Sequence, residues 1–152
     1  MSAIDEFVAQ CSIAVKEDRG PAAVKEVVER AVGDRHLLNE LPLEADVKIL
    51  HSAEDLTILH VVMAERPAGA GRPIPHNHLM WALIGVTHGS EENEFFRSSG
   101  RTIEPSGRGR GTLGLARPGF HSCVSVMCPR TPDRWDAPSV SDVGHLAESA
   151  GL

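Results

Sequence analysis

Residues 72–97 read RPIPHNHLMWALIGVTHGSEENEFFR, and this stretch decides the fold that the sequence predicts. It contains His76 and His78 at positions i and i+2, and side chains two apart lie on the same face of a β-strand. The apolar residues 79–86 follow without a break, which is typical of a strand buried on both faces. The sequence therefore predicts two imidazoles that project side by side at the start of a buried strand.

Outward from this strand, alternating apolar residues and turn-forming residues predict a mainly β body. In chain order, we expect strands at 47–51 and 56–63 around a turn at 52–55, a turn at 88–93, a returning strand at 94–97, a long turn at 98–111, a short strand around Leu113 and Leu115, and a strand at 121–127. Short strands with frequent turns favour a small barrel or sandwich.

The N-terminal residues predict two helices. A stripe of apolar residues at spacings of three and four indicates a helix over residues 2–17, and Ser2 with Asp5 resembles a capping pair. Pro21 is well placed to open a second helix that ends near Gly33. We expect a helical hairpin packed on the main body. The whole chain is interpreted as one domain, with a helical cap at 1–40, a barrel at 45–128 and an irregular tail at 129–152.

Composition sets the broad class of the protein. A length of 152 residues suits one domain, and 41% hydrophobic with 24% charged residues is ordinary for a soluble protein. The net charge of −6 argues against nucleic acid or an anionic membrane as partner, and no apolar run reaches the roughly 20 residues of a spanning helix. The acidic N-terminus is unlike a signal peptide, and three scattered cysteines fit a reducing cytoplasm.

A third histidine supports a metal site. His121 follows the pair by about forty residues, in the segment Arg-Pro-Gly-Phe-His. Three neutral imidazoles with open coordination positions suit Fe(II), Zn(II), Mn(II) or Ni(II). The other histidines are interpreted as non-ligands: His36 and His51 on the surface or in loops, His60 as a satisfied core histidine, His88 at the far end of its strand, and His145 in the tail.

The motif P-x-P-H-x-H at 73–78, the strand MWALIGV at 80–86 and the segment GSEENEFFR at 89–97 resemble the first conserved motif of the cupin superfamily. They are similar to its cysteine-dioxygenase-like branch, and the likeness covers residues 1 to about 105. The resemblance implies a jelly-roll double-stranded β-helix with two N-terminal helices. Most cupins carry a Glu four or five residues after the second His, where this chain has Ala82 or Leu83. A three-His site of His76, His78 and His121 is implied instead.

The same resemblance implies a reaction. Thiol dioxygenases use Fe(II) to add both atoms of O2 to a small thiol, so iron is the expected metal, with Zn, Mn or Ni as alternatives. A cationic side chain usually meets the substrate carboxylate, and Arg72 and Arg97 are the candidates. Glu91, Glu92 and Asn93 match the turn of the family and are interpreted as structural.

Two departures keep other functions open. The chain has no Tyr, and the likeness ends after about Arg108, where a change of reading frame near residues 107–112 is our hypothesis. A non-catalytic or degenerate cupin that binds a metal or small molecule is the main alternative, and a zinc-dependent cupin isomerase or hydrolase is a third. A barrel that lacks closing strands exposes edges, so a homodimer or poor solubility is also expected.

Overall fold

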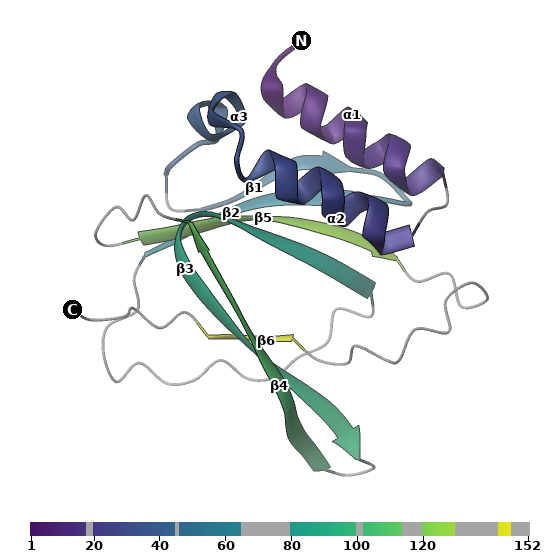
Figure 1. Ribbon diagram of the computed structural model, residues 1–152, viewed down its shortest axis with the longest axis vertical. Coiled ribbons are helices and arrows are strands. Elements are labelled where there is room, and N and C mark those ends of the chain that lie inside the picture. The colour runs from purple at the N-terminus through teal and green to yellow at the C-terminus, as the bar shows by residue number, and fades with distance from the viewer. Residues whose placement is uncertain are drawn as a thin grey trace.

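The computed structural model describes residues 1–17, 20–44, 46–64, 80–99, 102–113, 120–129 and 143–146. Its helices are α1 (Ala3–Lys16), α2 (Gly20–Ala31) and α3 (Arg35–Glu40). Its strands are β1 (Asp46–Ser52), β2 (Thr57–Ala64), β3 (Met80–Ser99), β4 (Thr102–Leu113), β5 (Phe120–Pro129) and β6 (Val143–Leu146) (Figure 1). All the strand pairs are antiparallel. The protein is therefore mainly β with a few helices, an arrangement compatible with a β-sandwich.

The long strand β3 connects two parts of the sheet, whose order is β1-β2-β5-β3-β4 with β6 also paired to β3. Its first half, from Met80 to His88, pairs with β5, and its second half pairs with β4 and β6. The change of partner coincides with a bulge between Val86 and His88 and with Gly89, whose φ of 74° is left-handed. Bulges and glycines bend strands in this way, so β3 can serve both parts.

Two predictions about this region are wrong. Residues 88–93 were expected to form a turn, but they continue β3, and the expected long turn at 98–111 contains most of β4. The polar residues of β3 are kept in a strand conformation by backbone pairing with β4, in which Glu91 lies opposite Gly111 and Asn93 opposite Gly109. Cross-strand pairing overrides the turn-like composition, because a strand needs backbone partners more than it needs strand-forming side chains.

The predicted helical cap is confirmed as a layer of α1 and α2, here called the helix layer, which covers one face of the sheet (Figure 1). Apolar residues of α1 at spacings of three and four are buried, and those of α2 likewise face inward. The buried core that they form with the sheet contains Phe7, Cys11, Ala14, Ala23, Val24, Val27, Val28, Ala31, Leu37, Leu41, Leu56, Ile58, Val124 and Val126.

The helix ends follow from local hydrogen bonds. The Asp5 N–H donates to Ser2 Oγ at 3.0 Å, and the Ser2 N–H donates to an Asp5 carboxylate oxygen at 3.0 Å, which confirms the expected capping pair. Asp34 caps α3 by accepting the His36 N–H at 2.8 Å. The short helix α3 was not predicted, and it brings Leu37 into the core with 1% exposure.

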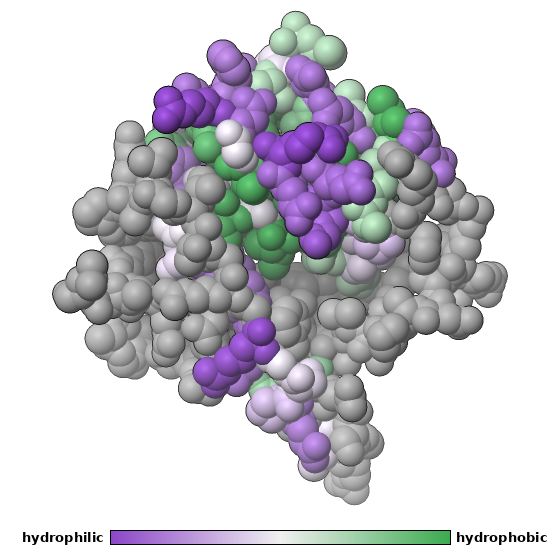
Figure 2. Space-filling model, viewed as in Figure 1, coloured by the Kyte–Doolittle hydropathy of each residue, from purple (hydrophilic) through white to green (hydrophobic). Residues whose placement is uncertain are grey.

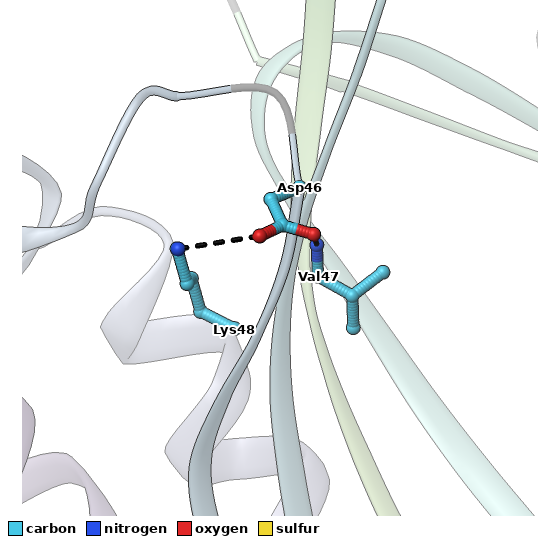
Figure 3. A network of polar contacts seen from close by, with 3 residues as sticks. All are labelled: Asp46, Val47 and Lys48. Carbon is cyan, nitrogen blue, oxygen red and sulfur yellow. Dashed lines mark hydrogen bonds and ion pairs between the residues drawn. The ribbon is translucent and has the colours of Figure 1, made fainter.

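Strand β1 forms one outer edge of the described sheet. Its Val47 N–H donates to Asp46 Oδ1 at 2.7 Å, and Lys48 Nζ lies 3.3 Å from Asp46 Oδ2 (Figure 3). The Val47 hydrogen bond, followed by Lys48, lowers the pKa of the Asp46 carboxyl. Charged side chains on an edge strand oppose pairing with another chain. The homodimer stays a prediction.

The expected irregular tail contains β6, whose Val143 and Leu146 lie opposite Phe95 and Glu92 of β3. Strands β1, β2 and β5 confirm the predicted strands at 47–51, 56–63 and 121–127. β1 and β5 are longer than predicted by one or two residues at each end, and β2 is shifted by one residue toward the C-terminus. Within the described ranges, every helix is too short or too polar to cross a lipid bilayer.

Candidate functional site

The structure leaves most of the predicted metal site undescribed. His76, His78 and Arg72 lie outside the described residues, between β2 and β3. The backbone of His121 lies in β5 opposite Met63, and that of Arg97 lies in β3 opposite Glu104.

The strand register separates His121 from the start of β3. Met80, which follows His78 by two residues, pairs with Pro129 at one end of β5, whereas His121 lies at the other end, beside the pair formed by His88 and Ser122. His121 and Pro129 are eight residue steps apart along β5, which is about 26 Å at a rise of 3.3 Å per residue. Ligands of one metal ion lie only about 2 Å from it. The register therefore does not bring His121 to the start of β3, where the pair is predicted.

Among the described ranges, which omit His76 and His78, no group of three His, Cys, Asp or Glu residues is placed to hold a metal ion. Two polar clusters do occur on opposite faces of β5. Strand alternation sends Ser122, Val124 and Val126 toward the helix layer, and Cys123 toward the opposite face.

The first cluster joins β3 to β5 on the face away from the helix layer. Glu91 is 1% exposed, and its Oε1 accepts a hydrogen bond from Asn93 Nδ2 at 3.1 Å. Burial, and next to it the negative charge of Glu91, raises the pKa of the Cys123 thiol. A thiol that stays protonated is a poor nucleophile and a poor metal ligand. This arrangement supports the structural interpretation of Glu91 and Asn93.

The second cluster lies on the face that the helix layer covers. Ser122 Oγ lies 2.8 Å from Thr87 Oγ1 and 3.1 Å from His88 Nδ1. His60 of β2 is 0% exposed, and neither of its ring nitrogens has a hydrogen-bond partner among the described residues. Burial, followed by the nearby His88, lowers the pKa of His60 from 6.5 to about 4.

Sequence reasoning missed this histidine pair. His60 was interpreted as a satisfied core histidine; the core position is confirmed, whereas neither ring nitrogen finds a hydrogen-bond partner among the described residues. His88 was placed at the far end of a strand, whereas it lies within β3 at the bulge. The apolar alternation around His60 was the available signal, since Ile58 and Val62 share its face and are buried.

A pocket of about 260 Å³ lies among the helices. On the face that carries the helices, Figure 2 shows apolar residues between polar ones. The pocket is lined by Ala3, Glu6, Phe7, Gln10, Val27, Arg30, Ala31, Asp34 and Leu37. Arg30 donates to Gln10 Oε1 at 3.4 Å, and Gln10 Nε2 donates to Glu6 Oε1 at 3.2 Å. Glu6, Gln10 and Arg30 are therefore bonded to one another, Asp34 Oδ1 accepts the His36 N–H, and none of these lining residues is His or Cys.

Known proteins provide no family assignment. No model of a known protein family matches the sequence, and no curated protein is significantly similar to it.

Proposed function

We propose that this protein is a cupin-like, metal-dependent oxidoreductase that oxidises a small thiol with O2, with Fe(II) held by His76 and His78. The observation that carries the proposal is the segment PIPHNHLMWALIGV, two imidazoles at i and i+2 directly before a strand. An antiparallel, mainly β body preceded by helices, of which α1 and α2 form a layer on the sheet, is consistent with this proposal.

The chemistry of the donors suits the proposal. Neutral imidazoles are common ligands of divalent iron and leave coordination positions for substrate and oxygen. Iron chemistry of this kind adds both oxygen atoms to the thiolate, RS⁻ + O2 → RSO2⁻, and needs no other reductant. Arg72 and Arg97 would attract a substrate carboxylate. The proposed setting is the cytoplasm, where small thiols are kept reduced.

The third ligand is the weakest part of the proposal. His121 was expected to complete the site, but the register puts it at the opposite end of β5 from Met80. This observation favours a second candidate function, a non-catalytic cupin that binds a metal or a small molecule through an incomplete ligand set. Zinc-dependent isomerase or hydrolase chemistry is a weaker candidate that no described contact supports.

Metal analysis of purified protein separates these functions. We expect stoichiometric iron in the wild type and none in the double variant His76→Ala/His78→Ala. The exposed His36 of α3 supplies the control, because His36→Ala should keep all the iron. His121→Ala tests the third ligand separately: retained iron would exclude it as a ligand and leave the pair intact.

Oxygen uptake then tests the reaction. An oxygen electrode with a panel of small thiols should record thiol-dependent uptake by the iron-loaded wild type and none by the double variant. The product should carry both atoms of ¹⁸O2. Bound iron without uptake would favour the non-catalytic cupin, zinc would favour the hydrolase or isomerase, and absence of metal would contradict the metal site itself.

A further inference from the structure

His60 lies in a row of paired residues that runs across four strands beneath the helix layer. The register joins Lys48 of β1, His60 of β2, Val124 of β5 and Gly85 of β3. Paired residues share a face, and at Gly85 this face touches the helix layer: a Cβ there would lie 2.7 Å from Val28 Cγ1. The His60 ring is therefore enclosed between the sheet and the helices, with 0% exposure.

The neighbouring row of paired residues joins Val62 of β2, Ser122 of β5 and His88 of β3. Its polar side chains contact one another, because the Ser122 hydroxyl lies within hydrogen-bond distance of both Thr87 and His88. The two ring nitrogens of His60 have no partner within the described residues. Burial without a hydrogen-bond partner has a free-energy cost even for a neutral imidazole. The cost is far larger for an imidazolium, because a buried charge without a partner loses its hydration.

Among the described residues, the groups around His60 offer no negative charge to its protonated ring. From β1 it faces Lys48, whose ammonium is held by Asp46 at 3.3 Å, and from β3 it faces His88. Helix α1 contributes the Cys11 thiol to the same core, and burial raises the pKa of that thiol to about 12, so it is neutral. The charged residues of α2 are Lys25, Glu26, Glu29 and Arg30, and all are exposed on its outer side.

We propose that His60 is an acid-sensitive contact between the sheet and the helix layer, and that protonation of its ring releases α1 and α2 from the sheet. This acid-sensitive contact does not depend on the proposed metal site. Neutral pH keeps the layer closed, and mild acid opens it reversibly while the strand pairs persist.

The direction follows from linkage. The pKa of His60 is lower when the helix layer is closed on the sheet than when it is open. The contribution of His60 to the closed state is therefore complete above pH 6.5 and is lost as the pH falls toward 4. With a pKa of about 4 when closed and 6.5 when open, the opening equilibrium rises roughly 60-fold between pH 7 and pH 4.5.

Hydrogen exchange resolves the two layers. Protection factors, corrected for intrinsic exchange, should fall roughly 60-fold for the amides of α1 and α2 between pH 7 and pH 4.5, and much less for those of β2 and β5. In His60→Met, which fills the space with a flexible apolar side chain, the helices should keep their protection. His51→Gln is the matched control, since His51 is a half-exposed histidine on the adjacent strand, and it should open as the wild type does.

Three results would overturn the proposal. The first is constant helix protection in the wild type down to pH 4.5. The second is equal loss in helices and strands, which would mean global unfolding. The third is opening of His60→Met at the wild-type pH. If the variant fails to fold, an NMR titration of the His60 ring in the wild type provides the test instead. A ring that titrates near pH 6.5 in the closed protein refutes the inference.

Discussion

The close approach of Gly85 to α2 allows a sharp test of the packing between helix layer and sheet. In Gly85→Ala the new Cβ would lie 2.6 Å from Val32 Cγ1, 2.7 Å from Val28 Cγ1 and 3.3 Å from Val124 Cγ2. Carbon atoms pack at about 3.5–4.0 Å, so either α2 and the Val32 that follows it must move by about 1 Å, or the Val28 and Val32 side chains must rotate. Val28 lies within α2, where a β-branched side chain has one strongly preferred rotamer. Helix movement is therefore the expected response.

The expected change in the free energy of unfolding of Gly85→Ala is the difference between two opposing effects. Overpacking of a close-packed core costs about 1–3 kcal/mol, and three simultaneous contacts favour the upper half of that range. Replacing Gly by Ala also restricts the unfolded chain, which offsets about 0.4–1 kcal/mol. We expect Gly85→Ala to lower the free energy of unfolding by about 1–2 kcal/mol.

Urea denaturation followed by circular dichroism measures this change. Gly33→Ala is the matched control: its Cβ would meet Arg30 O at an ordinary 3.5 Å, so the free energy of unfolding should stay unchanged or rise by up to about 1 kcal/mol. Val32→Ala removes the closest methyl group, so the double variant Gly85→Ala/Val32→Ala should be more stable than the two single effects predict, by about 1 kcal/mol. A Gly85→Ala protein as stable as the wild type, or strictly additive effects in the double variant, would refute the packing described here.

Three further predictions concern single contacts. Ser2→Ala should lower the free energy of unfolding by about 1 kcal/mol in urea titrations, and Ser2→Asp should restore most of it, because only the capping hydrogen bond is lost. Arg108→Gln should cost about 1 kcal/mol, since the guanidinium donates at 3.0 Å to a carboxylate that is 7% exposed; an unchanged unfolding midpoint would argue against this. A thiol reagent at pH 7 should modify half-buried Cys128 first, and Cys11 and Cys123 only in denaturant; equal rates for all three would contradict their burial.

The sequence by itself determined the elements that have a clear period. Apolar residues three and four apart fixed α1 and α2, and a face that buries Phe7 and Cys11 needs a partner surface wherever the rest of the chain lies. Strands β2 and β5 are rich in apolar residues and bury alternate positions on one face, as Ile58 and Val62 do in β2 and Val124 and Val126 do in β5. A mainly β protein with a helical layer was predictable from these patterns.

Tertiary structure alone decided the rest. Strand β4 is rich in glycine and arginine and has no strand-like period, so only its pairing with β3 makes it a strand. The strand register likewise decided that Met80 pairs at the end of β5 opposite to His121. The register cannot be read from the sequence, because residue spacing along the chain does not tell which residues of two strands pair. The environment of His60 depends on residues from β1, β3, β5 and the helix layer together. Its burial, unlike its place in an apolar strand, is a property of the assembled core.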